Sequence, residues 1–520
     1  MMNEENYTRT VVNRLIIITI ITGLTVIFSY IFRMFIARSL TVTDYGLFFS
    51  IFSLVAFFSI FRDFGFNEAL VRFIPLFKIK NEKNNLKYTM ILITLITLFV
   101  SLLIVISIII LSPFIAENFL HTSNATPIII LVAIAFFIAG GEWFFKNTFQ
   151  GYQMMGIFSS MNLIRAILLL FFAFIFIILG KGIFGVAYAY ILTPIVIVMV
   201  YMFIFIKKAE PDFLRIKSNF KIKEIYNNPL VKKIKDFAIP TMLGTGAMVI
   251  ITYTDSIMLT FFSGVFFVGL YNVALPAANF IGQIVLPLRT IIYPLSSELW
   301  TKKEIVKLSE GIKIVYKYLF MFLLPILFIF IAFSKDIITI LFGAKYVAAS
   351  GPLSILCIGM FFLSFSQINY STIGGIGKPK LNTYATIIAA ISNTILNLVL
   401  IPLYGIIGAA IATSTSYLIM ATISNIYLKR FIPVRLPIVK WLKNMVAGLI
   451  FLSTIKLLQI LIITNIYLKL ALIVSIGGII YIIMIFLLRL VSINEIKDLI
   501  KIYKHKPKSK INTDSEILGE

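Results

Sequence analysis

The sequence predicts an all-α polytopic membrane protein with about 14 transmembrane helices, arranged as two related six-helix bundles followed by two further helices. Hydrophobic residues make up 60% of the 520-residue chain and charged residues only 13%, and the mean hydropathy is +1.01. A soluble domain carries roughly 25% charged residues, so this composition indicates a protein of the lipid bilayer. Continuous apolar runs of about 20 residues tile the chain, and each is long enough to cross a membrane as a helix.

The apolar runs follow one another in a regular order, separated by short polar or glycine-containing segments. The first six lie near 15–37, 42–61, 88–112, 127–145, 157–179 and 183–206. The next six lie near 237–262, 266–293, 314–332, 352–373, 381–401 and 404–428. Two more follow near 441–463 and 466–490. An even number of crossings leaves both ends of the chain on one side of the membrane.

Five glycines of the first half recur in the second half, each 223 positions later. Gly23, Gly46, Gly151, Gly182 and Gly185 correspond to Gly246, Gly269, Gly374, Gly405 and Gly408. The offset pairs the first six helices with the next six. Because six is even, the two bundles are expected to point the same way, related by an axis along the membrane normal. Such internal repeats are typical of transporters that work by alternating access.

The repeat also predicts how the chain is divided. The expected segments are an N-terminal six-helix bundle over 1–206, a basic cytoplasmic linker over 207–235, a C-terminal six-helix bundle over 236–430, helices 13 and 14 over 431–490, and a basic cytoplasmic tail over 491–520. The linker is the longest polar stretch between two apolar runs. The last two helices have no counterpart in the first repeat.

Lysine and arginine gather in alternate loops, which accounts for the net charge of +24. The basic segments are 72–87, 207–235, 302–307 and 429–443. The intervening segments 113–126 and 402–403 hold no lysine or arginine. This positive-inside pattern predicts a plasma-membrane protein with both termini in the cytoplasm. It argues against nucleic acid as a partner, because the basic segments are better explained by contact with anionic lipid headgroups.

Cofactor signals are weak throughout the sequence. Cys357 is the only cysteine, so no disulfide can form within the chain. The two histidines, His121 and His505, are expected on opposite sides of the membrane, which argues against a metal site. The chain has no ATP-binding motif. We therefore expect no resident cofactor, and an H⁺ or Na⁺ gradient is the candidate energy source.

Several motifs resemble those of a known transporter family. They are Leu396 to Thr413, which reads LNLVLIPLYGIIGAAIAT, Ala37 to Phe48, which reads ARSLTVTDYGLF, and Phe342 to Tyr346, which reads FGAKY. Together they resemble the polysaccharide transporters of the multidrug/oligosaccharidyl-lipid/polysaccharide exporter superfamily. The resemblance implies a MATE-like fold with two six-helix lobes around a central cavity. It also implies an outward-translocating flippase for a lipid-linked oligosaccharide, in polysaccharide or glycoprotein biosynthesis beside glycosyltransferases or a polymerase.

Ionisable residues inside apolar runs are the main functional candidates, because they are costly when they face lipid. Arg33 lies late in the first run and Asp255 late in the seventh, and the repeat offset places them at similar depth in opposite bundles. We therefore predict a salt bridge that gates the outer side of the cavity. The alternative is that both residues reach the membrane surface with their polar ends. Asp255 and Asp63 are also the candidates for carrying a coupling H⁺ or Na⁺.

Further candidates would bind the substrate. Arg165 lies in the fifth run, and Arg62 and Arg289 end the second and eighth. Guanidinium groups bind phosphate through paired charge-assisted hydrogen bonds, so these arginines and Arg33 are candidates for the headgroup of a polyprenyl phosphate or diphosphate. Ordinary anchoring at the cytoplasmic surface is the alternative for each. Asn393 and Asn397 lie on one helix face and are candidates for sugar binding, with helix packing as the alternative.

Two other functions fit parts of the sequence. A multidrug or metabolite exporter of the same superfamily would use an acidic cavity, and it would depend on Asp255 more than on Arg33 and Arg165. A membrane glycosyltransferase or polymerase would need a carboxylate pair and a large outer region, whereas the first outer loop offers only Asp44. The sequence therefore favours a flippase that is not an enzyme.

Overall fold

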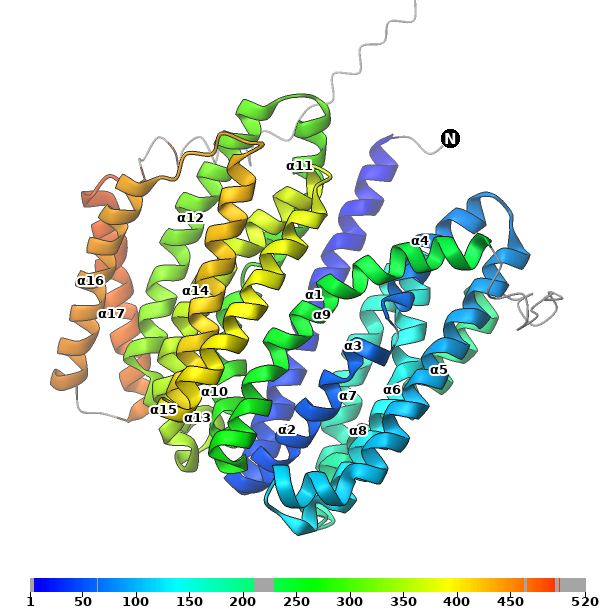
Figure 1. Ribbon diagram of the computed structural model, residues 1–520. Coiled ribbons are helices and arrows are strands. Elements are labelled where there is room, and N and C mark those ends of the chain that lie inside the picture. The colour runs from blue at the N-terminus through cyan, green and yellow to red at the C-terminus, as the bar shows by residue number, and fades with distance from the viewer. Residues whose placement is uncertain (1–3, 63, 210–228, 463–464, 492–494, 496–520) are drawn as a thin grey trace, which may run out of the picture. The chain divides into compact units, whose positions relative to one another are not determined.

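The computed structural model describes residues 4–62, 64–209, 229–462, 465–491 and 495, and those residues form helices joined by short turns, with no strand among them (Figure 1). The contacts divide the chain into two compact units. Unit 1 comprises residues 1–308 and 333–433, and unit 2 comprises 309–332 and 434–520. The predicted linker lies largely outside the described residues, which omit 210–228, and so does most of the predicted tail.

In the first repeat, successive long helices run in opposite directions through the bundle. Its helices are α1 (Glu4–Ser39), α2 (Val42–Phe57), α3 (Ser59–Arg62), α4 (Phe66–Ile79), α5 (Lys83–Phe114), α6 (Thr126–Gly151), α7 (Met155–Ile178) and α8 (Gly182–Ile204). A π-helical turn, Ile115–Phe119, and a 3₁₀ turn, Ser123–Ala125, join α5 to α6, and another π-helical turn, Phe205–Ala209, follows α8. The amphipathic helix α4 is an element that the apolar runs did not predict.

The second repeat follows the same order of elements. Its helices are α9 (Pro229–Ser263), α10 (Val265–Gln283), α11 (Leu286–Thr301), α12 (Ile305–Ala332), α13 (Ser334–Phe342), α14 (Ser350–Gly375) and α15 (Pro379–Lys429), with a 3₁₀ turn at Ala344–Ala349. The final helices are α16 (Ile438–Leu461) and α17 (Ile466–Leu487). The run expected over 266–293 is interrupted, because α10 ends at Gln283 and α11 begins at Leu286.

Thirteen helical segments of the described chain are long and apolar enough to span a membrane. One of them, α15, consists of two helices that meet at Gly405, whose φ of 54° and ψ of −129° are not helical. The chain reverses there, because a Cβ on Gly408 would lie 2.1 Å from the Leu400 carbonyl oxygen, whereas eight residues of straight helix span about 12 Å. Counting both arms of α15, the described residues contain 14 helices long and apolar enough to cross a membrane, the number that the sequence predicts.

The structure confirms the glycine repeat in its backbone geometry. Gly182, the counterpart of Gly405, has a similar φ of 50°, which favours glycine because it lacks a Cβ. At the other end of the bundles, a Cβ on Gly151 would lie 2.8 Å from the Leu70 carbonyl oxygen. A Cβ on Gly374 would lie 2.9 Å from the ring of Tyr293, which is the residue 223 positions after Leu70. Equivalent helices therefore pack in equivalent ways.

The two repeats meet along α2 and α10, where their backbones touch. A Cβ on Gly46 would lie 1.9 Å from the Val265 carbonyl oxygen, and a Cβ on Gly269 would lie 2.4 Å from the Val42 carbonyl oxygen. Val42 and Val265 are themselves repeat counterparts, so the contact is reciprocal. This is the geometry of a pseudo-twofold axis that passes between the two glycines.

The end of unit 1 that contains this contact is called the far end here, and includes the turns at 40–41, 179–181, 264 and 403–405. The opposite end, with turns at 80–82, 152–154, 302–304 and 376–378, is called the basic end. In Figure 1 the far end is at the bottom.

Cations from each repeat cap a helix of the other repeat at the far end. Arg38 donates from Nε to the Leu341 carbonyl at 3.1 Å and from its terminal nitrogen to the Ile340 carbonyl, at the C-terminus of α13. Lys345 donates to the carbonyls of Arg38, at 3.0 Å, and Leu40, at the C-terminus of α1. Helix C-termini attract cations because their last carbonyls have no partner within the helix. The far end is therefore closed by contacts between the repeats.

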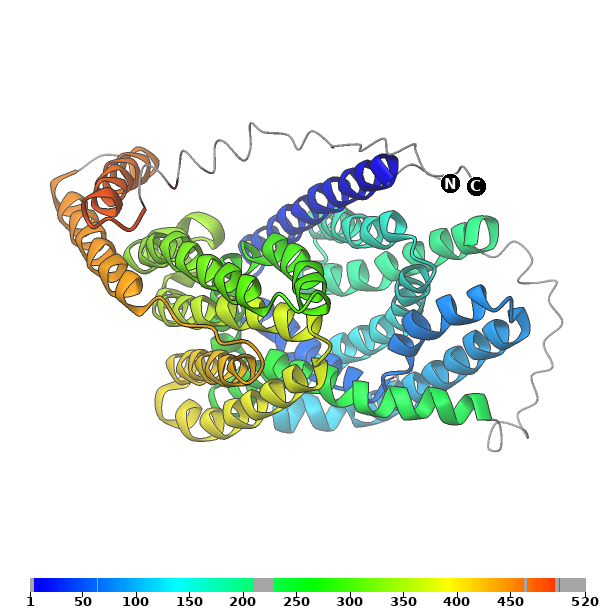
Figure 2. The same cartoon turned by 90° about the horizontal axis from the view of Figure 1, so that it is seen from above.

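Toward the basic end the helices form two groups. Seen from above, the blue and cyan helices lie on one side and the green to yellow helices on the other, except that part of α9 lies beside the first repeat (Figure 2). The start of α9 packs on α4, where a Cβ on Gly65 would lie 2.4 Å from the Ala238 carbonyl oxygen and the rings of Phe73 and Phe237 are 6.1 Å apart. Pro240, inside α9, removes one helical hydrogen bond in this region.

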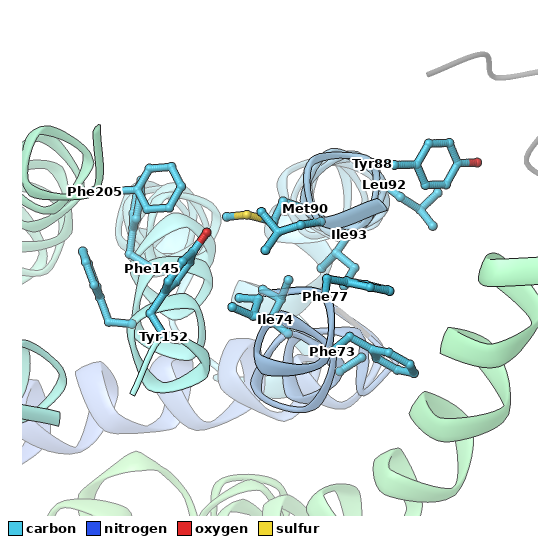
Figure 3. Packing of buried hydrophobic residues seen from close by; sticks show 14 of the residues in the cluster. Phe73, Ile74, Phe77, Tyr88, Met90, Leu92, Ile93, Phe145, Tyr152 and Phe205 are labelled. Atoms are coloured by element: carbon cyan, nitrogen blue, oxygen red, sulfur yellow. The ribbon is translucent and has the colours of Figure 1, made fainter. Parts of the chain in front are cut away.

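An apolar cluster holds α4 against α5 and α6 near the basic end (Figure 3). Phe73, Ile74 and Phe77 of α4 face Met90 and Ile93 of α5, and all five are buried. The cluster explains why α4, which is too short to span a bilayer, is held firmly in the bundle. It also supports one side of the cavity described below.

Unit 2 consists of α16, α17 and most of α12. A Cβ on Gly448 would lie 2.6 Å from Leu324, so α16 and α12 are in close contact. Tyr481 of α17 donates a hydrogen bond to the Met321 carbonyl at 2.7 Å. The final pair of helices therefore packs on a helix of the second repeat, and the contacts group α12 with that pair rather than with the predicted 236–430 bundle.

The α2–α10 contact predicts the effect of adding one methyl group. Gly46→Ala should destabilise the protein by about 1–3 kcal/mol, because the new Cβ overlaps a backbone oxygen that has no room to move. Gly23→Ala is the matched control, since a Cβ there meets nothing within 4 Å and alanine favours the helix. The thermal unfolding midpoint of each purified variant in detergent is the measurement. Equal midpoints for the two variants would contradict the close approach.

Candidate functional site

Three adjoining hollows have volumes of about 260, 320 and 250 Å³; the first and third lie between the two repeats, and the second lies within the first repeat between α1, α7 and α8. They share lining residues. Arg33 borders the first and second hollows, and Tyr253 borders the first and third. Arg165 and Tyr190 border the second and third. We call them together the central chamber. Its walls come from α1, α2, α3, α6, α7 and α8 of the first repeat and from α9 and α10 of the second.

Arg33 lies at the junction of two of these hollows. Its guanidinium carbon lies 4.9 Å from the centre of the Phe49 ring, which holds the group by a cation–π interaction. Its Nη1 is buried and has no hydrogen-bond partner among the described residues. A buried guanidinium nitrogen without an acceptor is a site for an anion.

Arg165 faces the chamber from α7 and is paired with an acid that the sequence analysis missed. Its Nη1 lies 3.4 Å from Oε1 of Glu142 on α6. The Arg165 side chain keeps 35% of its surface exposed, whereas the Glu142 side chain keeps only 6%. Glu142 follows two glycines in the apolar run 127–145, and an acid within such a run was the signal that could have identified it.

Arg62 completes a group of three cations around the chamber. It ends α3, is buried, and its guanidinium carbon lies 5.0 Å from the centre of the Phe136 ring. It lines the third hollow together with Arg165. No acid is among the described residues that line the three hollows, and Glu142 lies behind Arg165. The described lining of the chamber is therefore net positive.

Asp255 is not in the chamber, and the predicted salt bridge with Arg33 is wrong for this structure. Tyr253 lines the chamber, and a residue two positions later on a helix points about 200° away. Asp255 therefore faces α15 and is only 1% exposed. The rotation of α9 about its own axis decides which neighbour Asp255 faces. A helix that is apolar on every side gives no sequence signal for that rotation.

Four donors surround the Asp255 carboxylate. Asn397 donates to Oδ1 at 2.6 Å and Asn393 at 3.2 Å, while Tyr271 donates to Oδ2 at 2.5 Å and Thr413 donates to the same oxygen. All five residues are buried. This polar cluster ties α9 and α10 to both arms of α15. Asn393 and Asn397, the candidates for sugar binding, both have their amides in this cluster and line neither the chamber nor the cavity at the basic end, which favours the helix-packing alternative.

A larger cavity of about 1050 Å³ lies at the basic end between α4, α9, α11, α14 and α15. Its charged lining residues are Arg72, Lys233, Asp236, Arg289 and Lys380. Hydroxyl and amide groups make up much of the remaining wall, including those of Thr241, Thr245, Gln367, Tyr370, Asn382 and Thr383. Arg289 therefore lies here, apart from Arg62 and Arg165, and the predicted group of arginines is divided between two cavities. Asp63 lies outside the described residues.

Comparison with known proteins identifies the family. The family model described as Polysaccharide biosynthesis protein matches residues 11–300, and the model described as MatE matches residues 240–399. The membrane protein MJ1068 of Methanocaldococcus jannaschii is 30% identical over 91% of this chain and 94% of its own length. The probable low-salt glycan biosynthesis flippase Agl15 of Haloferax volcanii is 30% identical over 28% of this chain and 30% of its own length.

Among solved structures, the lipid II flippase MurJ in an inward closed conformation has a similar fold. It superposes with a TM-score of 0.71 at 19% identity, covering 93% of this chain and all of that chain (100%). At this identity the likeness concerns the fold alone. It confirms the predicted arrangement of two lobes with two further helices.

The Asp255 cluster predicts a large stability effect from a nearly isosteric change. Asp255→Asn should destabilise the protein by about 2 kcal/mol or more, because an amide nitrogen replaces one acceptor oxygen opposite buried donors. Glu117→Gln is the control, since that carboxylate is exposed. Thermal unfolding of the purified variants measures the difference. An unfolding midpoint for Asp255→Asn equal to that of the control would show that the cluster does not hold α9 and α15 together.

Proposed function

The chain belongs to the polysaccharide biosynthesis protein family of the multidrug/oligosaccharidyl-lipid/polysaccharide exporter superfamily, and we propose that it flips a lipid-linked oligosaccharide from the cytoplasmic to the outer leaflet of the plasma membrane. The protein is a multi-pass membrane transporter by family and fold. The name of its Haloferax relative, a glycan biosynthesis flippase, supports a glycan as the cargo. The glycan would come from glycosyltransferases and pass to a polymerase or another transferase of the same pathway.

The observation that carries the proposal is the group of arginines around the central chamber. A polyprenyl phosphate or diphosphate must lose much of its hydration when its headgroup enters the membrane, and fixed guanidinium groups replace that hydration with charge-assisted hydrogen bonds. Arg33 offers a buried nitrogen that has no hydrogen-bond partner in the described part of the chain, and Arg165 is partly exposed. Arg62 adds charge without facing the hollow that the other two share.

The cavity at the basic end supports a route of entry. Its volume of about 1050 Å³ suits a short oligosaccharide, and its hydroxyl and amide groups suit sugar hydroxyls. Arg72 and Arg289 would meet the phosphate before it reaches the chamber. The lipid tail would stay in the bilayer, so the protein needs a polar path only for the headgroup.

The distribution of charge supports a cytoplasmic basic end and therefore cytoplasmic termini. With the far end closed by Arg38, Lys345 and the two glycines, this conformation would receive its substrate from the cytoplasmic leaflet. Opening of the far end and closure of the basic end would then release the headgroup outside. This sequence is alternating access between two lobes.

A coupling ion is part of the proposal. Four side chains donate hydrogen bonds to the Asp255 oxygens, and some of these donors would have to be displaced before an ion could bind there. Oδ1 of Asn397, however, is buried and has no hydrogen-bond partner among the described residues. Oxygen ligands from a carboxylate, amides and the Thr413 hydroxyl suit a hard cation. We therefore assign the coupling role predicted for Asp255 to Na⁺ rather than H⁺.

The multidrug-exporter alternative has one observation in its favour, the MatE match over residues 240–399. Cationic drugs, however, would be repelled by a chamber with Arg33, Arg62 and Arg165 beside one paired acid. The same chamber suits an anionic headgroup. We therefore place the protein with the lipid-linked glycan transporters of the superfamily.

Neutralising either chamber arginine should slow flipping. Arg33→Gln and Arg165→Gln should each lower the rate about tenfold or more, because a charge-assisted contact to phosphate is lost. Arg435→Gln is the control, since that arginine is exposed and lines neither cavity. The assay follows a fluorescent lipid-linked oligosaccharide across the bilayer of proteoliposomes. Wild-type rates in both chamber variants would refute the proposed headgroup site, and new glycosidic bonds in the assay would indicate an enzyme.

Sodium should stabilise the protein and drive transport. Na⁺, but not K⁺ or choline, should raise the thermal unfolding midpoint of wild-type protein, since a ligand that binds only the folded state stabilises it. The same ion, applied as a gradient, should accelerate flipping. Asp255→Asn should abolish both responses. Identical midpoints and rates in Na⁺ and K⁺ would exclude Na⁺ as the coupling ion.

A further inference from the structure

Two buried carboxylates lie in the membrane-spanning part of unit 1, and their surroundings differ sharply. Asp255 accepts hydrogen bonds from four side chains. Glu142 has one contact, the ion pair with Arg165 at 3.4 Å, and its Oε2 is buried with no hydrogen-bond partner among the described residues. A buried ionised carboxylate needs several donors to offset its lost hydration, and Arg165 is the one ion-pair partner that the described residues give Glu142.

Arg165 is also the group that the proposed function gives to the substrate. Its side chain is more exposed than that of Glu142 and borders two hollows of the central chamber. A phosphate in the chamber and the Glu142 carboxylate would therefore compete for one guanidinium. Once the phosphate has taken Arg165, the Glu142 carboxylate would be buried beside a second anion without a partner, which is unfavourable on both counts.

We propose that Glu142 is a proton-binding site linked to substrate binding: an anionic headgroup displaces the Glu142 carboxylate from Arg165, and Glu142 then binds one proton. The Arg165–carboxylate pair breaks, an Arg165–phosphate pair forms, and the proton comes from the buffer acid of the bulk solvent, which becomes its conjugate base. No other bond changes. The inference rests on the proposed function, because it needs an anionic ligand at Arg165.

The groups around Glu142 leave no better partner for the displaced carboxylate. The titratable or charged side chains that face this region are Lys146 on α6, Arg165 on α7, Arg62 on α3, Tyr190 and Tyr201 on α8, and Tyr253 on α9. Lys146 lies one turn from Glu142 and interacts with it electrostatically, but no ion pair within 4 Å joins them and its ammonium is placed over the Trp143 ring, 4.7 Å from the ring centre. Arg62 is held against Phe136. Tyr201 bonds to Ser160 at 3.0 Å.

Proton uptake on ligand binding tests the inference directly. Farnesyl diphosphate, a short lipid diphosphate, is titrated into purified wild-type protein by calorimetry in buffers of different ionisation enthalpy. We expect about one more proton taken up per bound molecule by wild type than by Glu142→Gln, which keeps Arg165 but cannot ionise at position 142. Glu142→Asp should restore the uptake, because it keeps a carboxylate. Glu117→Gln should behave as wild type.

The same linkage predicts a pH dependence of ligand affinity. Comparing wild type with Glu142→Gln removes the contribution of the ligand's own titration, because that contribution is the same for both proteins. Over the pH range in which binding takes up the extra proton, the affinity of wild type relative to that of Glu142→Gln should fall as the pH rises, by up to about tenfold per pH unit, since each bound ligand brings a proton. Equal proton uptake by wild type and Glu142→Gln, with both binding the ligand, would overturn the inference and leave the flippase intact. If wild type did not bind the diphosphate, Arg165 would not be a binding residue for it, and the inference would fail. The flipping assay tests the transport function separately.

Discussion

Direct backbone contact between α2 and α10 is the constraint on which the rest of the structure depends. Gly46 and Gly269 let the two repeats meet without side chains between them, and the contact is reciprocal because Val42 and Val265 occupy equivalent positions. Interactions between Arg38 and α13 and between Lys345 and α1 close the same end. With the repeats held together there, the space between them lies toward the basic end, where the chamber and the larger cavity are found.

The membrane interior makes each buried charge informative. Asp255 and Glu142 are both excluded from water, yet one is satisfied by four donors and the other by a single arginine at 3.4 Å. The first arrangement fixes helices, because losing the acceptor leaves several donors without partners. The second arrangement can change, because its one partner also faces the chamber. The number of hydrogen bonds to each carboxylate thus separates a cluster that holds helices together from an ion pair that can exchange its partner.

The repeat, the number of crossings and the reversal at Gly405 could all be predicted, because they depend on apolar length and on glycines that recur at a fixed offset. The positions of Arg33 and Arg165 beside a cavity also follow from the cost of leaving such residues in lipid. The rotation of each helix could not be predicted, since helices that are apolar on every side carry no amphipathic signal. Asp255 was therefore expected to face Arg33, although it faces α15 with Asn393 and Asn397.

The two repeats share a backbone fold but differ in the positions of their charged and polar side chains. The residues 223 positions after Arg62, Glu142 and Arg165 are Val285, Phe365 and Ile388, so the second repeat has no counterpart of the chamber charges. The residues 223 positions before Asp255, Asn393 and Asn397 are Phe32, Leu170 and Phe174, so the first repeat has no counterpart of the polar cluster. Packing glycines were kept in both halves, because both need the same close approaches. The ionisable groups differ because a chamber between two lobes needs its cations on only one wall, while the other lobe has to remain rigid as it moves.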